Sequence, residues 1–346
     1  MPPVTANGKI IEVTLAVGVI GTGKIGADHV RRLASQVSGA GVTAVFDVAQ
    51  ECAAEIADDI GAAAHSSWEA LVDHSDVEAV VIASPGPLHA EQVLACIAAG
   101  KPVLCEKPLA TTGQDCLKVI EAEVAFGGRL VQVGFMRRYD RAYRVVKMAI
   151  DDGSIGEPLL GHMVHRNASV PENFTSDMAM TDSLIHEIDT IRWLFGQEVV
   201  ATTVVGSRSS PLAAAGLRDP QLVLLELADG GVVDVEVFVN CQYGYDVRCE
   251  VVGSTGTVSM DNPGTNSLRR NGQLTQSVPA DWRVRFSTAY LDELQEWVHG
   301  LAAGVVGGPS SWDGYAAAVV ANCAVQALAD GARTKVFLVD RPALYA

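Results

Sequence analysis

The chain has 346 residues, with 25 lysine and arginine side chains against 41 aspartate and glutamate side chains, which gives a formal net charge of -16. This length predicts about two domains, and a composition that is 49% hydrophobic and 19% charged excludes an intrinsically disordered protein. The acidic balance argues against nucleic acid or an anionic membrane as the main partner, because both require a basic surface.

Alternating strands and helices are expected in the first 135 residues. The predicted strands are 13–20, 42–47, 77–83, 101–106 and 130–135, and the predicted helices are 23–35, 51–60, 89–99 and 114–125. Strands that alternate with helices predict a parallel sheet with right-handed crossovers. The strand segments lack a polar–apolar alternation, which fits strands buried on both faces.

The pattern changes in the second part of the chain, which we assign to a second domain, 136–346. Its predicted strands are 159–167, 199–207, 221–227, 232–241, 247–253 and 257–260, which favours an open, mainly antiparallel sheet. One helix, 182–195, interrupts this run. Helices at 287–303 and 312–329 precede a last strand at 336–339, and they are expected to pack back on the first domain. The predicted fold class is therefore α/β throughout.

The seven cysteines are scattered without a C-x-x-C pair, which argues against a zinc site or a disulfide framework. No apolar run approaches the roughly 18 residues that a membrane span needs. Residues 1–9 lack the order of basic, apolar and small residues that marks a signal peptide. We therefore expect a soluble cytoplasmic protein.

A glycine-rich turn, Gly21-Thr22-Gly23-Lys24-Ile25-Gly26, follows the first predicted strand and opens a helix. In that context Gly21 permits a tight turn, Gly23 lets a pyrophosphate approach, and Gly26 allows close packing of helix on strand. Asp47 ends the second strand, where an acid would bind ribose hydroxyls and repel a 2′-phosphate. The pattern predicts an NAD-binding Rossmann domain, against the alternative of an ordinary glycine turn.

The tripeptide Glu106-Lys107-Pro108 ends another strand of the same predicted sheet. Ligands of open α/β sheets bind beyond these strand ends, so Lys107 would point toward the nicotinamide. A cation there can stabilise the alkoxide that forms during hydride transfer. The alternative is a solvated lysine before a turn proline.

The third motif is Asp182-x-x-x-His186-x-x-Asp189. In a regular α-helix these offsets put the three side chains on one stripe, where a carboxylate could orient a histidine as a general base. One alternative is helix capping by Thr181, with acidic residues favoured in the first turn. A second is a metal site in which His162, His165 and His186 gather around Asp182. No known ligand spacing supports the metal.

Together the three motifs resemble those of the Gfo/Idh/MocA family of nicotinamide-dependent sugar and polyol oxidoreductases. Segments of the second domain resemble the family members that act on inositol: 165–167, 175–179, 186–189 and 240–246. The resemblance implies NAD-dependent oxidation of myo-inositol to scyllo-inosose. Alternatives are a family enzyme for scyllo-inositol, another inositol isomer or an aldose, and a cofactor-binding regulator without catalysis. A scaffold without cofactor is disfavoured by the complete glycine turn.

The resemblance also implies roles for individual residues. Catalysis would use His186 to take the hydroxyl proton, Asp182 to orient His186, and Lys107 to stabilise the alkoxide, and the sequence leaves open how the proton transfer divides between Lys107 and His186. The implied NAD contacts are Gly21, Gly23, Lys24, Ile25, Gly26, Asp47, Ser84, Pro85, His89, Glu106 and Lys107, and the implied substrate contacts are Lys107, Met136, His165, Asn167, Asp182, His186 and Tyr245.

Two further features bear on these expectations. The segment 84–89 lacks an asparagine that the family often has after its proline, so the cofactor contacts of that loop differ in detail. The resemblance also implies a homo-oligomer, with a tetramer expected, because the exposed face of an open sheet needs a cover. No nucleic acid, membrane or metal is expected as a partner.

Overall fold

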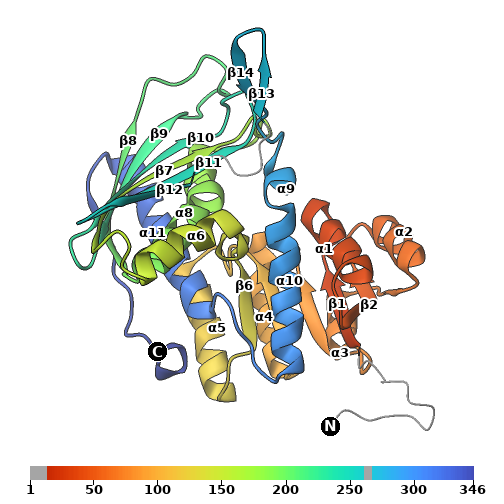
Figure 1. Ribbon diagram of the computed structural model, residues 1–346. Coiled ribbons are helices and arrows are strands. Elements are labelled where there is room, and N and C mark those ends of the chain that lie inside the picture. Colours follow the sequence, from red (N-terminus) through yellow and green to blue (C-terminus); the bar gives the residue numbers. More distant parts are fainter. Residues whose placement is uncertain (1–13, 261–266) are drawn as a thin grey trace.

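The computed structural model describes residues 14–260 and 267–346 and confirms the predicted α/β class. Two sheets and the helices that cover them form adjoining layers (Figure 1). Val13 of the first predicted strand and the segment 1–9 lie outside the described residues.

The first sheet has six parallel strands in the order β3-β2-β1-β4-β5-β6. The chain order reverses between β1 and β4, and ligands of such sheets bind at this point. All residues of β4, β5 and β6 are buried, as expected for strands covered on both faces. The strands are β1 Leu15–Ile20, β2 Ala40–Phe46, β3 Ala63–Ala64, β4 Ala79–Ile82, β5 Val103–Glu106 and β6 Val131–Gly134.

Helices cover both faces of this sheet, and two of them come from the end of the chain. One face packs with α1, α2 and α10, and the opposite face packs with α3, α4, α5 and α11. The predicted return of the late helices is therefore observed. The helices are α1 Lys24–Ser35, α2 Gln50–Ile60, α3 Trp68–Asp73, α4 His89–Ala98, α5 Gly113–Phe126, α10 Ser287–Ala302 and α11 Ser311–Asp330.

A buried carboxylate fixes the end of the chain to the first sheet. Glu123 of α5 accepts hydrogen bonds from the main-chain N–H groups of Leu130 and Val131, at 2.6 and 2.9 Å. Its second oxygen accepts from the hydroxyls of Ser311 and Tyr345. The C-terminus accordingly lies beside α5 (Figure 1).

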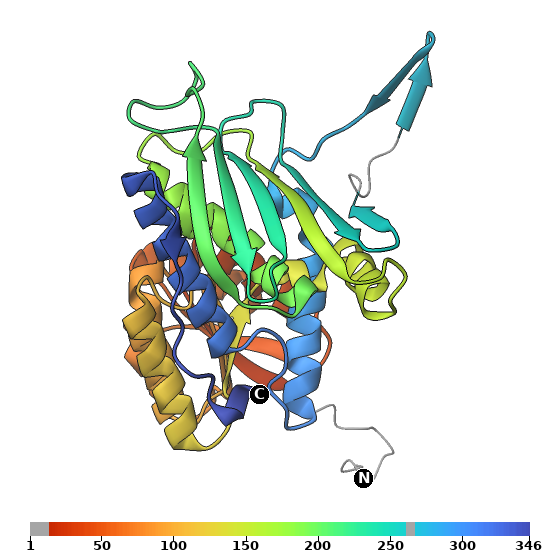
Figure 2. The same cartoon turned by 90° about the vertical axis from the view of Figure 1, so that its left-hand side faces the viewer.

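The second sheet has seven strands in the order β12-β11-β7-β10-β9-β8-β15, and only the β7–β10 pairing is parallel. Its inner face packs on α8 and α11, whereas Figure 2 looks onto the other face. Burial alternates along β9 and β10, as expected for strands with one covered face. The elements are β7 Pro158–Arg166, α8 Ile185–Phe195, β8 Val199–Gly206, β9 Gln221–Leu227, β10 Val232–Phe238, β11 Asp246–Gly253, β12 Thr257–Met260 and β15 Thr334–Lys335.

The predicted last strand at 336–339 is wrong. The strand is β15, which covers only Thr334–Lys335, and Val336 adds one bond from its N–H to the carbonyl of Val200. The chain then leaves the sheet, and the N–H of Val339 donates to the Tyr315 hydroxyl of α11. Packing against α11 therefore overrides the strand propensity of this apolar run.

Short connecting elements complete the described chain. They are η1 Gly86–Leu88, η2 Met136–Tyr139, α6 Arg141–Asp151, α7 Ser176–Met178, a π-helical turn η3 Ala179–Leu184, the hairpin β13 Ser267–Arg270 with β14 Gln273–Gln276, α9 Trp282–Arg285 and η4 Ala343–Tyr345. Across residues 14–260 and 267–346, no helix combines the length and the apolar character that crossing a membrane requires.

Candidate active site

The glycine-rich turn joins β1 to α1 and uses each glycine differently. Gly21 has a φ of +91°, and a Cβ atom there would lie 2.6 Å from the backbone of Ala83 and Ser84. A Cβ atom on Gly26 would lie 1.9 Å from the carbonyl oxygen of Gly21. Gly23, by contrast, is the N-cap of α1 with no side-chain cap, and a Cβ atom there would meet nothing within 4 Å. The helix N-terminus therefore has room and N–H groups for a phosphate.

Asp47 follows β2 and is held beside this turn. One carboxylate oxygen accepts hydrogen bonds from the N–H and the hydroxyl of Thr22, at 2.6 and 3.2 Å. The other oxygen accepts from the N–H of Ala49 at 2.9 Å. These contacts place a carboxylate at the tip of the phosphate-binding turn, where it can meet ribose hydroxyls.

The loops after β4 and β5 are joined by His89. Its two ring nitrogens each lie 2.7 Å from a main-chain carbonyl oxygen, one of Ser84 and one of Pro108. The resemblance implied a cofactor contact for His89. In the structure His89 is only 1% exposed and bridges the two loops, and its contact with the cofactor stays a prediction. Pro85 lies in the first of these loops, before η1.

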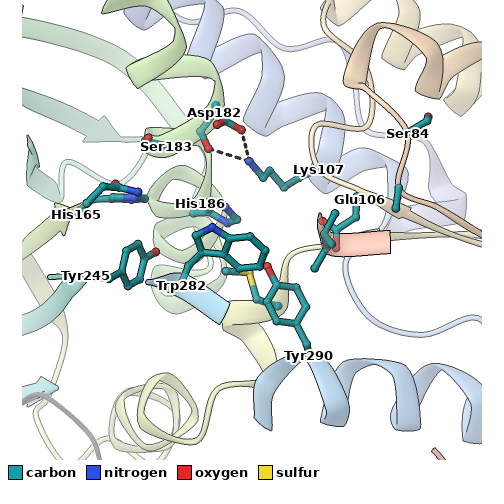
Figure 3. Close-up of a pocket in the computed structure, with 14 residues that line it drawn as sticks. Ser84, Glu106, Lys107, His165, Asp182, Ser183, His186, Tyr245, Trp282 and Tyr290 are labelled. Carbon is teal, nitrogen blue, oxygen red and sulfur yellow. Dashed lines mark hydrogen bonds and ion pairs between the residues drawn. The ribbon is translucent and has the colours of Figure 1, made fainter. Parts of the chain in front are cut away.

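A cavity of about 300 Å³ opens beyond the carboxyl ends of the first sheet, against the second sheet and its helices (Figure 3). The structure brings together in it the sequence-predicted residues Ile25, Ser84, Glu106, Lys107, Met136, His165, Asn167, Asp182, His186 and Tyr245. A second hollow of about 460 Å³ continues from it and is lined in part by Lys24 and Asn167. Gly21, Gly23, Gly26 and Asp47 lie along the same edge of the first sheet, at the turn described above.

Sequence reasoning missed four residues of the lining: Ala83, Ser183, Trp282 and Tyr290. Ser183 directly follows the predicted residue Asp182 in the chain, and Ala83 is the first residue after β4. Trp282 and Tyr290 come from α9 and the start of α10, far along the chain from every motif. Local sequence offers no signal that separates these two aromatic residues from ordinary core residues.

Lys107 reaches across the cavity to Asp182 (Figure 3). Its Nζ donates to the main-chain carbonyl of Asp182 at 3.0 Å and also forms an ion pair with the carboxylate. The charge of Lys107 holds the pKa of Asp182 below its ordinary value, against the burial that would raise it. The cavity therefore contains an ammonium and a carboxylate that balance one another.

The expected stripe of Asp182, His186 and Asp189 is not observed. Asp182 lies in the π-helical turn η3, whose wider spacing removes the four-residue register assumed for a regular α-helix. Its carboxylate pairs with Lys107, and no hydrogen bond joins it to His186 within residues 14–260 and 267–346. Asp189 is fully buried and makes two hydrogen bonds with Arg138 instead.

The helical segment also begins earlier than predicted. It starts at Ser176, where the Thr175 hydroxyl caps the helix by accepting from the N–H of Met178 at 3.2 Å. Thr181, the alternative cap, lies inside the π turn and donates to the carbonyl of Asp177.

His186 is buried at the side of the cavity. Burial, reinforced by the positive charges of Lys107 and Arg137 and by His165, lowers the pKa of His186 well below 6.5. Its Nδ1 is buried, with no hydrogen-bond partner in the part of the chain that the structure describes. The imidazole is therefore neutral at neutral pH and able to accept a proton.

Three predicted substrate contacts come from the second sheet. His165 lies in β7, Asn167 follows β7, and Tyr245 precedes β11. The rings of His165 and Tyr245 meet edge to face at 5.8 Å. The Oδ1 atom of Asn167 is buried without a partner among the described residues. A buried acceptor without a donor is costly in free energy.

The alternative of a metal site is not supported by this arrangement. His162 is three residues from His165 on β7, so it lies on the other face of the sheet, where it pairs with Asp234. In residues 14–260 and 267–346, no three or more His, Cys, Asp or Glu side chains are grouped in a way that could hold a metal ion.

Two family models match this chain. The model of the oxidoreductase family with an NAD-binding Rossmann fold matches residues 15–135, and the Gfo/Idh/MocA C-terminal domain matches residues 143–259. The chain belongs to the Gfo/Idh/MocA family. It is thus an NAD-dependent oxidoreductase with an NAD-binding Rossmann domain, as the glycine turn and Asp47 predict.

Relatives within the Gfo/Idh/MocA family include proteins named for inositol. The chain is 51% identical to inositol 2-dehydrogenase 3 of Saccharopolyspora erythraea, over 96% of this chain and 98% of the relative. It is also 51% identical to inositol 2-dehydrogenase of Pseudomonas savastanoi, over 96% and 100%. The crystal structure of myo-inositol dehydrogenase from Lactobacillus casei with NAD(H) and myo-inositol is 37% identical, has a TM-score of 0.93, and covers 96% of this chain and 100% of that one.

Proposed function

We propose that the protein oxidises a ring hydroxyl of myo-inositol, giving the ketone scyllo-inosose, with NAD as hydride acceptor. The observation that carries this proposal is the cavity that sets the Lys107–Asp182 pair beside a neutral, buried His186. The names of the relatives support the choice of inositol, since chains about 51% identical to this one are inositol 2-dehydrogenases.

The chemistry of the cavity favours an uncharged polyol. The charges of Lys107 and Asp182 balance one another, so this pair offers no net charge to an acidic or basic substrate. The side chains of Asn167 and His186 line the cavity, and both residue types can form hydrogen bonds with the hydroxyls of a polyol. A site built on such hydrogen bonds rejects an analogue that lacks one hydroxyl by about 10⁴-fold or more.

Each catalytic side chain has one task in this proposal. His186 accepts the proton of the reacting hydroxyl, because its lowered pKa keeps it neutral. Lys107 donates a hydrogen bond to the same oxygen and stabilises the alkoxide as it forms. Asp182 holds Lys107 in place, so it acts through the lysine and not through His186 as the sequence suggested. When bound, NAD supplies the hydride acceptor.

The residues at the glycine turn fit NAD. The uncapped N-terminus of α1 has space at Gly23 for a pyrophosphate, and Asp47 stands at the tip of the turn. The carboxylate of Asp47 would accept hydrogen bonds from ribose hydroxyls and repel a 2′-phosphate. We therefore propose that NAD is preferred over NADP.

The test is reduction of NAD and of NADP, followed by absorbance, with myo-inositol, scyllo-inositol and glucose offered separately. We expect the largest kcat/KM with NAD and myo-inositol. A larger value with scyllo-inositol or glucose would overturn the substrate, and a larger value with NADP would overturn the role of Asp47. Identification of the product as scyllo-inosose by mass spectrometry and NMR completes the assignment.

A further inference from the structure

A buried cluster of charged residues lies directly behind the cavity. Arg137 of η2 and Glu187 of α8 form an ion pair in which both side chains are at most 1% exposed. His165 completes the cluster: its Nδ1 lies 3.0 and 2.9 Å from the two carboxylate oxygens of Glu187 and 3.1 Å from Nη2 of Arg137. His165 also lines the cavity, so the cluster connects the substrate site to the protein interior.

The contacts of Nδ1 decide which ring nitrogen of His165 carries the proton. Without a proton, the lone pair of Nδ1 would face two carboxylate oxygens at hydrogen-bond distance inside the protein, which is repulsive. With a proton, Nδ1 donates to the carboxylate in a charge-assisted bond. Nη2 of Arg137, which can only donate, also lies near Nδ1 at 3.1 Å, but the two carboxylate oxygens are nearer, at 3.0 and 2.9 Å, and their charge outweighs this single contact. Burial alone would raise the pKa of Glu187, but Arg137 and His165 hold that pKa below its ordinary value, so the carboxylate is charged.

We infer that Glu187 is a positioning residue that fixes the proton of His165 on Nδ1 and leaves Nε2 as a hydrogen-bond acceptor in the cavity. This inference rests on the proposed function for the identity of the ligand. The neutral imidazole has one donor and one acceptor nitrogen, so the choice at Nδ1 determines the choice at Nε2. The cavity then requires a substrate hydroxyl that donates at this position, which an O-methyl or deoxy analogue cannot do.

The variant Glu187→Gln should reverse the tautomer of His165, although it only replaces one carboxylate oxygen by an NH₂ group. Its amide oxygen must stay toward Arg137, since arginine can only donate. The amide NH₂ then takes the place of Oε2, 2.9 Å from Nδ1 of His165, and donates to it. Nδ1 becomes the acceptor and Nε2 carries the proton. The matched control is Glu198→Gln, because Glu198 is likewise paired with an arginine, Arg192 of α8, but lies away from the cavity.

Neutron diffraction from deuterated crystals tests the tautomer without any turnover. We expect deuterium on Nδ1 of His165 in the native protein and on Nε2 in Glu187→Gln. Deuterium on Nε2 in the native protein, with or without deuterium on Nδ1, would overturn the inference. Because this readout needs no substrate, it separates a failure of the inference from a failure of the proposed substrate, which would show as absent native activity with inositol.

Kinetics provide the second test. We expect Glu187→Gln to raise KM for myo-inositol about tenfold or more, with kcat changed less than KM, because a donor replaces an acceptor at one hydroxyl. Glu198→Gln should leave both constants near the native values. In a double-mutant cycle, the effect of Glu187→Gln should disappear in a His165→Ala background. An equal effect in both backgrounds would show that Glu187 does not act through His165, and would overturn the inference.

Discussion

Among the residues that the structure describes, Asp182 alone holds the ammonium group of Lys107, through two contacts. The sequence motifs identified both side chains, but the assumption of a regular helix paired Asp182 with His186. The observed pairing has a chemical consequence, because an ammonium fixed by these two contacts can present its remaining hydrogen atom to a substrate oxygen.

Replacing Lys107 by methionine removes that charge while keeping a long side chain. We expect kcat for NAD reduction to fall about 100-fold or more, as for the loss of a group that stabilises transition-state charge. NAD affinity, measured by calorimetry, and circular dichroism should change little. The control is Lys147→Met, which removes a lysine from an exposed pair with Asp151 on α6 and should leave kcat unchanged. A Lys107→Met enzyme with native kcat would remove Lys107 from the mechanism.

The neutral state of His186 predicts how stability depends on pH. Its folded pKa is lowered below the ordinary 6.5, so the unfolded chain binds a proton that the folded chain does not bind. This contribution is complete above pH 6.5 and is lost as pH falls below it. Between pH 7.5 and 5.5, the native protein should lose about 1 kcal/mol more unfolding free energy than His186→Gln. Urea unfolding at one protein concentration measures the difference, and equal losses would contradict a neutral buried His186.

The π turn between α7 and α8 shows how an element places a functional residue. Three short segments form one continuous helical path from Ser176 to Phe195, and Asp182 lies in its widened part. Such bulges place side chains at angles that a regular helix cannot provide, and they occur often at functional sites. Sequence periodicity assumes a constant repeat, and this is why it misplaced Asp182 relative to His186.

Two glycines of the turn have different roles: Gly26 is needed for close packing, and Gly23 leaves space for the cofactor. One substitution at each position tests this. Gly26→Ala puts a methyl group 1.9 Å from the Gly21 carbonyl, and overpacking of this kind lowers stability by about 1–3 kcal/mol. Gly23→Ala meets nothing within 4 Å, so the unfolding free energy should change by less than about 1 kcal/mol.

The effect of Gly23→Ala should appear in NAD binding, because the added methyl group occupies the space for the pyrophosphate. We expect at least tenfold weaker binding of NAD to Gly23→Ala by calorimetry. Native affinity in Gly23→Ala, or native stability in Gly26→Ala, would contradict the separate roles of these glycines.

The open face of the second sheet carries exposed apolar side chains. Leu160, Val205 and Leu222 are 43%, 49% and 40% exposed, and Val205 and Leu222 are cross-strand neighbours. Exposed apolar area of this kind is typical of protein interfaces. We expect a homo-oligomer that uses this face, and a tetramer is expected from the family resemblance.

Light scattering should therefore give a multiple of the 36.4 kDa chain mass, four for a tetramer. Leu222→Lys should lower that mass, because it places a charge on the proposed interface. Val124→Lys, which changes an exposed residue of α5 outside that face, should not lower it. The mass of one chain for the native protein would refute this interface.

The two sheets and the glycine turn could be derived from the sequence because their signals are local. Buried strands need continuous apolar runs, and a phosphate-binding turn needs glycine where a Cβ atom would collide with the backbone, as at Gly21 and Gly26. The strand ends then place Lys107 and Asp47 at one edge of the first sheet. These features follow from residue type and spacing alone.

The tertiary structure decided what depends on contacts between distant segments. It paired Lys107 with Asp182, brought Trp282 and Tyr290 to the cavity, and buried Glu187 between Arg137 and His165. It also ended the last strand at Lys335, because the following residues pack on α11. The physical reason is the same in each case: burial and pairing energies act between residues that are neighbours in space, and sequence spacing does not determine those distances.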